Sequence, residues 1–315
     1  MRAFAVDEFG ADGSIHEVPV PEPGDGEVLV AVRAAGVNVM DPLYVAGVMK
    51  DYMEHRFPLI PGIDFAGVVE RSGTGVDGFA AGDDVYGVSA KPFVGAGTFA
   101  EHAVIGADTV APKPESLTFT EAAAVPHTGL TALGAIEAAD PQPGQIVVVI
   151  GATGGVGSFV TQLAAARGAT VVAITSVSGA AQARDYGAAE AIDYGAGDVG
   201  AALRQRYPDG VDSVIANYGD VELLTAVARS LRPGGMVVSP AIQQDDAELA
   251  LKGFSVTFRS ADRLPPARLP DLTTLFDAGQ LRVPPIRLFP LDAAEAALSA
   301  MAGGHVRGKL VVSIR

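Results

Sequence analysis

Hydrophobic residues fill an unbroken run at 146–150 and then recur at helical spacing over residues 156–164. The β-branched run predicts a parallel strand covered on both faces, and the later periodicity predicts a helix that ends near Gly168. A second apolar run, 170–175, predicts the next strand. Residues 145–175 therefore predict a strand, a turn, a helix and a second strand in succession.

The turn between this strand and helix is rich in glycine. It reads GATGGVG, with glycines at 151, 154, 155 and 157. Glycines permit a tight turn and the close approach of a pyrophosphate, while the helix N-terminus offers unpaired N–H groups and a positive dipole end. The strict G-x-G-x-x-G spacing is not met, because Ala152 occupies its first glycine position. The turn still predicts dinucleotide binding, because it stands between a predicted strand and a predicted helix.

The same patterns divide the chain. Residues 1–120 hold many short strands between Gly, Pro and Asp turns, which is typical of a small β-barrel or sandwich. Strands and helices alternate over 145–258 and give six strands, which predicts a doubly wound parallel sheet. We therefore predict an α/β protein with two domains, residues 1–120 with 265–315 and residues 121–264. The cleft between them is the expected ligand site.

Several strings resemble one protein family. GATGGVG resembles its A-x-x-G-G-V-G turn, and AAGVNVMD (34–41), PGIDFAGVVERSGTGVDGFAAGDDVYG (61–87) and GTFAEHAVI (97–105) resemble its GroES-like catalytic domain. The ending HVRGKLVVSI resembles the closing strand that returns to that domain. The family is the quinone oxidoreductase, or zeta-crystallin-like, branch of the zinc-independent medium-chain dehydrogenases/reductases. The resemblance implies a β-rich GroES-like domain, a Rossmann domain and a small electrophilic substrate.

The composition argues against several classes of function. The chain of 315 residues is 49% apolar with a net charge of −15, which indicates a globular protein and disfavours binding to nucleic acid or anionic membranes. The absence of cysteine excludes disulfides and cysteine-containing zinc sites, and the five histidines show no metal-ligand spacing, so no metal site is expected. Neither a run of about 18 apolar residues nor an export signal is visible, so a cytoplasmic location is expected.

The end of the second predicted strand bears on the choice of dinucleotide. NAD-binding units usually carry a carboxylate there, whereas this chain has Thr175, Ser176 and Ser178 and no carboxylate before Asp185. Hydroxyl donors without a repelling carboxylate favour NADPH over NADH. Relatives carry a lysine near Gly179, which this chain lacks. Positive charge would then come from other residues, namely Arg184, Arg307 or Lys309.

The residues expected to bind the coenzyme come from the glycine turn, the carboxyl ends of the strands and the closing strand. They are Asn38, Thr131, Thr153, Gly154, Gly155, Val156, Gly157, Thr175, Ser176, Ser178, Tyr194, Asn217, Gly219, Pro240, Ala241, Arg307 and Lys309. Thr131 and Tyr194 are assigned by resemblance, to residues beside the nicotinamide and the adenosine. The alternatives are a helix position for Thr131 and simple packing for Tyr194.

The expected reaction depends on which residues stand at the zinc-ligand positions of related enzymes. By resemblance, Asn38 and Asp64 stand where related alcohol dehydrogenases have zinc ligands. The sequence therefore offers no Lewis acid, which disfavours simple alcohol oxidation. Hydride transfer to a quinone or to the β-carbon of an enone needs only hydrogen bonds or a proton from solvent. NADPH-dependent reduction of quinones or conjugated enones is the predicted reaction.

Four side chains are the catalytic candidates: Asn38, Tyr44, Tyr52 and His127. The Asn38 amide would donate to the acceptor oxygen, or else cap a turn. Tyr44 and Tyr52 would be pocket walls or donors. His127 would act as an acid or base, or else be structural. Asp41 is expected to be an ionised cap, because an ordinary aspartate has a pKa near ~3.9.

Two other functions remain open. An enoyl reductase acting on a thioester or polyketide intermediate would use the same coenzyme. A non-catalytic sensor or structural protein would bind NADPH without turnover. In any of these roles, the edge of the predicted strand 255–259 is expected to pair with a second copy and form a homodimer.

Overall fold

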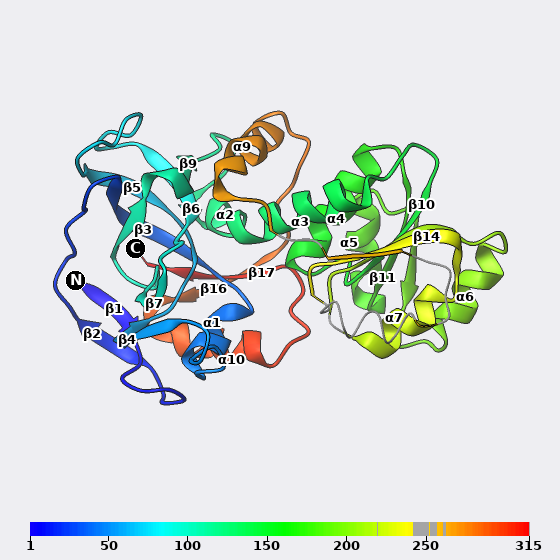
Figure 1. The fold of residues 1–315 in the computed structure, drawn as a ribbon, viewed down its shortest axis with the longest axis horizontal. Helices are drawn as coiled ribbons and strands as arrows, with labels where there is room; N and C mark the ends of the chain where they lie inside the picture. The colour runs from blue at the N-terminus through cyan, green and yellow to red at the C-terminus, as the bar shows by residue number, and fades with distance from the viewer. Residues whose placement is uncertain (219, 242–251, 253–256, 261–262, 315) are drawn as a thin grey trace. The chain divides into compact units, whose positions relative to one another are not determined.

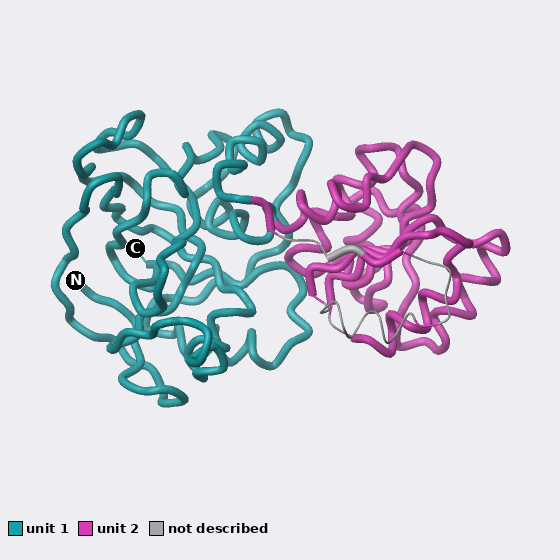
Figure 2. Tube along the Cα trace, viewed as in Figure 1, with its two compact units in different colours: residues 1–130, 265–315 teal, residues 131–264 magenta. Residues whose placement is uncertain are grey.

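The computed structural model describes residues 1–218, 220–241, 252, 257–260 and 263–314. The chain divides into two compact units (Figure 2). Unit 1 consists of residues 1–130 and 265–315, and unit 2 of residues 131–264. Each unit has its own sheet and its own hydrophobic core.

Unit 2 is built on a six-stranded parallel sheet. The strand order is β12 (Glu190–Asp193), β11 (Thr170–Thr175), β10 (Ile146–Ile150), β13 (Val211–Ala216), β14 (Leu231–Ser239) and β15 (Thr257–Ser260). Val147, Val148 and Val149 in the middle of β10 are fully buried, because both faces of the sheet are covered. The predicted doubly wound sheet is confirmed. Residues 255 and 256 of the predicted last strand lie outside the described residues.

Four helices follow strands of this sheet (Figure 1): α4 (Gly155–Ala166), α5 (Ala180–Asp185), α6 (Val199–Arg206) and α7 (Val221–Ala228). Right-handed crossovers put α4 and α5 on one face and α6 and α7 on the other. α6 and α7 pack against each other there. The direction of the strand order reverses between β10 and β13. Ligands of doubly wound sheets bind at such a reversal, outside the carboxyl ends of the strands.

Unit 1 contains a seven-stranded sheet. Its order is β16 (Ile286–Pro290), β17 (Lys309–Ser313), β3 (Glu27–Val37), β5 (Asp64–Ser72), β6 (Asp84–Val88) and β9 (Val110–Pro112), with β8 (His102–Gly106) paired to β3. The long strand β3 pairs antiparallel with β17, β5 and β8. The closing strand therefore returns to the first part of the chain, as expected. Phe4, Phe65 and Phe99 are buried in the core of this unit.

Two small sheets and four short helices complete unit 1. They are β1 (Arg2–Ala5) with β2 (Ser14–Glu17), β4 (Glu54–Ile60) with β7 (Phe93–Ala96), and α1 (Met40–Val45), α2 (Phe119–Ala123), α9 (Leu269–Asp277) and α10 (Ala294–Ala302). α2 packs on β3 and β5. A Cβ at Gly36 would lie 2.3 Å from the carbonyl oxygen of Ala123, so this close approach of α2 requires glycine.

Helix α3 (Pro126–Ala139) begins in unit 1 and continues into unit 2. It starts at Pro126. The reason is that the fixed φ of Pro126 suits a first helical turn, where the missing N–H costs no hydrogen bond. Within the described residues, neither α3 nor any other helix combines the length and the apolar character needed to cross a membrane.

Candidate functional site

The glycine turn joins the carboxyl end of β10 to α4. Gly151 has a φ of 72°, and a Cβ on Gly157 would lie 2.1 Å from the carbonyl oxygen of Gly151. The turn can therefore close against the helix only with glycine at both positions. α4 starts after Gly154 without a side-chain cap, whereas aspartates cap α6 and α7. The first N–H groups of α4 are thus left for an external anion, which fits the pyrophosphate of a dinucleotide.

Side chains tie this turn to the end of β11. The Oγ1 atoms of Thr153 and Thr175 lie 2.7 Å apart, and both residues are buried. Beyond the strand, the Oγ atoms of Ser176 and Ser178 lie 3.1 Å apart, and Ser178 is exposed. The position that usually selects between NAD and NADP therefore carries hydroxyl groups and no carboxylate.

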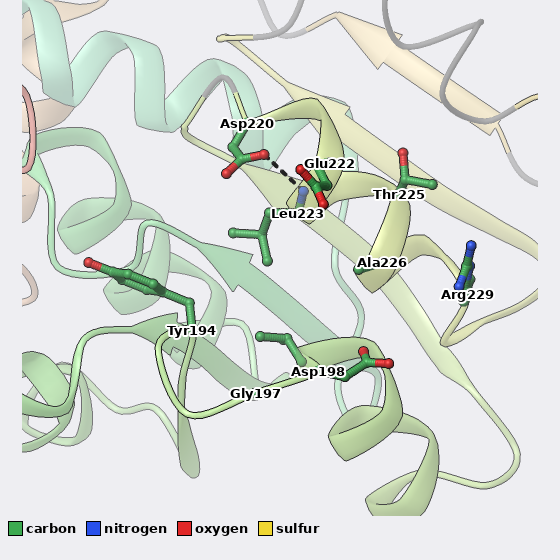
Figure 3. A pocket seen from close by; sticks show the side chains of 10 residues that line it. Tyr194, Gly197, Asp198, Asp220, Glu222, Leu223, Thr225, Ala226 and Arg229 are labelled. Carbon is green, nitrogen blue, oxygen red and sulfur yellow. Dashed lines mark hydrogen bonds between the residues drawn. The ribbon is translucent and has the colours of Figure 1, made fainter.

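A cavity of about 530 Å³ lies beside the segments that follow β12 and β13 (Figure 3). Its lining combines apolar with charged residues: Tyr194, Gly197, Asp198, Val199, Asp220, Glu222, Leu223, Thr225, Ala226 and Arg229. Asp198 and Asp220 cap α6 and α7 by accepting main-chain N–H groups of Ala201 and Leu223, each at 2.9 Å. A partly apolar pocket with carboxylates at its rim suits a flat heterocycle that carries amino donors.

The other expected coenzyme residues of unit 2 follow its strands. Asn217 comes after β13, and its Nδ2 donates to the carbonyl oxygen of Ile150 over 3.3 Å. Pro240 and Ala241 come after β14, where the Ala241 N–H donates to Oγ of Ser239. Gly219 lies outside the described residues. The carboxyl ends of the strands thus carry these residues to one edge of the sheet.

Unit 1 holds a buried cluster of charged and amide side chains. Its members are Asn38, Asp41, Asp64 and Lys309, none more than 3% exposed. Nζ of Lys309 donates to the Asn38 Oδ1 over 2.8 Å and to the Val37 carbonyl oxygen over 3.0 Å, and lies 3.9 Å from Oδ2 of Asp64. Nδ2 of Asn38 donates to the same Oδ2 over 3.0 Å. The pairing of β3 with β5 and β17 brings these residues together.

Asp64 also reaches α3. Its Oδ1 accepts the main-chain N–H of His127 over 3.0 Å, in the first turn of that helix. A carboxylate at this place complements the helix dipole. Two candidate catalytic residues, Asn38 and His127, are therefore bound to opposite oxygens of one carboxylate. Thr131 lies one turn after His127 on α3 and is buried.

The charges of the cluster are shifted by burial. Burial raises the pKa of Asp41 to about 7, the N–H of Asn38 opposes this rise, and the charge of Asp64 adds to it. Burial lowers the pKa of Lys309, against the attraction of Asp64 and Asp41. The pKa of Asp41 is therefore above the ordinary value that the sequence suggests, because a fully buried carboxylate loses its hydration.

The remaining candidates lie in different surroundings. Lys309 is buried among protein groups, contrary to the expectation that its ammonium meets a coenzyme phosphate, whereas Arg307 is exposed. Tyr52 is 80% exposed. The ring of Tyr44 lies 6.4 Å from that of His55, centre to centre. Among the described residues, no group of three or more His, Cys, Asp or Glu is arranged to hold a metal ion.

Sequence reasoning missed the residues that line the cavity and the internal role of Lys309. Asp198 and Asp220 carry a usable signal, because each stands directly before a helical stretch as an N-cap residue does. No comparable signal marks Lys309, whose partners lie more than 240 residues away in the chain.

Comparisons with known proteins agree with this architecture. Residues 24–115 match the alcohol dehydrogenase GroES-like domain, and residues 186–312 match the family described as zinc-binding dehydrogenase. The chain is 31% identical over 330 residues to 2-methylene-furan-3-one reductase of Solanum lycopersicum. This alignment covers 99% of this chain and 79% of that protein. It is 35% identical over 311 residues to the spectinabilin polyketide synthase system protein NorB of Streptomyces orinoci, covering 94% of this chain but 14% of that protein's length.

Solved structures give the same result. The quinone oxidoreductase from Coxiella burnetii superposes with a TM-score of 0.88 at 30% identity, covering 100% of this chain and 99% of that one. The CurK enoyl reductase superposes with a TM-score of 0.86 at 25% identity, again covering 100% and 99%. A GroES-like unit joined to a Rossmann unit defines a class of NAD(P)-dependent oxidoreductases. The chain belongs to the medium-chain dehydrogenase/reductase superfamily, in its quinone oxidoreductase branch.

Proposed function

We propose that the chain reduces quinones or conjugated enones with NADPH, by direct hydride transfer and without zinc. The observation that carries the proposal is the glycine turn of unit 2, whose helix α4 starts without a side-chain cap. The similarity to a quinone oxidoreductase over the whole chain also supports the proposal. A bound nicotinamide supplies the hydride, and the tasks of the protein are to bind, to orient and to exclude water.

The residues of unit 2 have distinct parts in binding the coenzyme. The main-chain N–H groups of Gly155, Val156 and Gly157 bind the pyrophosphate, and the cavity beside Tyr194 receives the adenine. Ser176 and Ser178 donate to the 2′-phosphate, which favours NADPH, since no carboxylate repels it there. Asn217 faces the ribose. The exposed Arg184 and Arg307 are the sources of positive charge that remain once Lys309 is buried.

The substrate that accepts the hydride needs a hydrogen-bond donor beside its oxygen, because that oxygen gains negative charge. Nδ2 of Asn38 has two hydrogens, of which Asp64 accepts one. The other is available to the acceptor oxygen, as a preorganised donor is in oxyanion stabilisation. Tyr44 and Tyr52 are the pocket walls. His127 is the candidate for proton transfer, and Thr131 packs beside the nicotinamide.

A panel of acceptors tests this function. The purified chain is mixed with NADPH or NADH and with simple quinones, enals, enones and enoyl thioesters, and coenzyme oxidation is followed by absorbance. Quinones and enones are expected to support oxidation of NADPH at a higher kcat/KM than oxidation of NADH. Binding of NADPH without oxidation by any acceptor would instead identify a non-catalytic sensor or structural protein.

An enoyl reductase is the second candidate function. It is favoured by the likeness to a polyketide synthase protein and to the CurK enoyl reductase. Enoyl thioesters would then be the best acceptors in the same panel, with quinones slow.

We also propose that the active form is a cytoplasmic homodimer. β15 ends the sheet of unit 2 in the described part of the chain, so its free edge is suited to pair with that of a second copy. Sedimentation equilibrium would give a mass twice that of the chain, and a concentration-independent monomer would refute the dimer.

A further inference from the structure

The amide of Asn38 has only one orientation in its buried surroundings. An ammonium can only donate hydrogen bonds, and an ionised carboxylate can only accept them. Lys309 must therefore face the oxygen of the amide, and Asp64 must face its nitrogen, as the distances of 2.8 Å and 3.0 Å show. A rotation of the amide by half a turn would set donor against donor and acceptor against acceptor. The second Nδ2 hydrogen thus has a fixed direction.

We propose that Lys309 and Asp64 are positioning residues of the reaction, acting on the acceptor through the Asn38 amide. The positive charge at Oδ1 draws electron density from the amide nitrogen and strengthens its remaining N–H as a donor. The negative charge of Asp64 holds that nitrogen in place. The inference rests on the proposed function, because it needs an acceptor whose oxygen gains charge during hydride transfer.

The burial of the cluster away from water makes this effect significant. Lys309 and Asp64 are 2% and 0% exposed, so little water screens the field of the ammonium at the amide. Hydrogen bonds in a chain polarise one another, here from the ammonium through the amide to the acceptor. The cluster thus gives an uncharged amide part of the electrophilic character that a direct cationic contact would supply.

The surroundings of Lys309 support its role as a charged group. The partners of its ammonium are the Val37 carbonyl in β3, the amide of Asn38 just after β3, and the Asp64 carboxylate in β5. Asp41, from α1, also attracts it whenever its carboxyl group is ionised. These contacts oppose the loss of the proton that burial alone would favour.

The test replaces the charge and keeps the hydrogen bonds. Lys309→Gln retains a donor toward Asn38 but is neutral, and Lys309→Met removes both. Lys113→Gln is the matched control, because Nζ of Lys113 donates to the carbonyl oxygens of Pro114 and Leu117 and lies 3.9 Å from Asp84. Each variant is assayed with NADPH and a series of quinones of decreasing reduction potential, and its Kd for NADPH is measured by fluorescence.

The expected result is a loss of kcat that depends on the acceptor. For Lys309→Gln, kcat should fall about tenfold for weakly electrophilic quinones and little for strongly electrophilic ones. The Kd for NADPH and the Lys113→Gln kinetics should stay within twofold of the wild type. The same fall for every quinone, or none, would overturn the positioning role.

A second measurement keeps the proposal falsifiable if the Lys309 variants do not fold. Asp64→Asn preserves the shape of the side chain but removes the negative charge that holds Nδ2 of Asn38 and lies 3.9 Å from Nζ of Lys309. It should also lose kcat more steeply for weak acceptors, and a uniform loss would count against the proposal. Absence of turnover in the wild type with all acceptors would instead refute the proposed function itself, and the positioning role with it.

Discussion

The main-chain N–H of Asn38 donates to Oδ2 of Asp41 over 2.7 Å, while Oδ1 of the same carboxyl group is buried without a hydrogen-bond partner. The main-chain N–H groups of Asn38 and Gly62 favour the ionised form of this carboxyl group, but the loss of hydration on burial outweighs them. This agrees with the pKa of about 7, which burial raises from the ordinary value. Asp41 thus remains largely protonated in the folded chain over a pH range in which the unfolded chain has lost the proton.

Replacement of Asp41 by asparagine is expected to change how stability depends on pH. A raised pKa in the folded state means that stability is full below the ordinary pKa of aspartate and falls as pH rises toward the folded pKa of about 7. Asp41→Asn removes this titration. Between pH 5 and pH 8 the wild type should therefore lose about 3 kcal/mol of unfolding free energy relative to Asp41→Asn.

Urea unfolding at a series of pH values measures this difference. Asp108→Asn is a suitable control, because Asp108 is exposed in unit 1, and it should follow the wild type. Parallel curves for the wild type and Asp41→Asn would show that Asp41 has an ordinary pKa in the folded chain.

Gly157→Ala is expected to impair the coenzyme site. The added Cβ would lie 2.1 Å from the carbonyl oxygen of Gly151, so the turn before α4 must move away from the helix. Overpacking of this kind costs about 1–3 kcal/mol in stability, and we expect the Kd for NADPH to rise about tenfold or more. Gly303→Ala, whose Cβ would meet nothing nearer than 3.5 Å, is the control. Equal affinities in titration calorimetry would show that the turn does not contact the coenzyme.

Ser176→Asp is expected to reverse the choice of coenzyme. It restores a carboxylate just after β11, which would repel a 2′-phosphate and accept hydrogen bonds from the ribose hydroxyls of NADH. We expect the Kd for NADPH to rise about tenfold or more, and that for NADH to stay or fall. Ser176→Ala separates the lost hydroxyl from the added charge. Equal changes for both coenzymes would place the 2′-phosphate elsewhere.

The sequence predicts unit 2 well because each local signal agrees with its place in the sheet. The run 146–150 lacks polar residues because both faces of β10 are covered, and the glycines of the following turn are required by close contacts. Edges of elements are predicted less well. The actual start of α3 at Pro126 depends on a single residue that suits either a helix start or a break.

The polar cluster of unit 1 shows what residue types alone do not reveal. Asn38, Asp64 and Lys309 lie far apart in the chain and meet only through the pairing of β3 with β5 and β17. The sequence suggests Lys309 as a source of positive charge for the coenzyme, because the lysine expected near Gly179 is missing, but it does not show that Lys309 is buried. The pKa of Asp41 depends on burial, which no local pattern in its segment specifies.

His127 provides the sharpest test of a side chain in proton transfer. Its main-chain N–H donates to Oδ1 of Asp64, and this hydrogen bond does not require the imidazole. His127→Ala therefore tests the ring and leaves the Asp64 contact in place. Histidine is suited to proton transfer near neutral pH, so we expect kcat to fall about 100-fold and one limb of its pH profile to disappear. His102→Ala is the control, since His102 lies in β8 with its Nε2 3.3 Å from Oε2 of Glu70 and is not a catalytic candidate. If His127→Ala keeps the turnover and pH profile of the wild type, the proton comes from solvent.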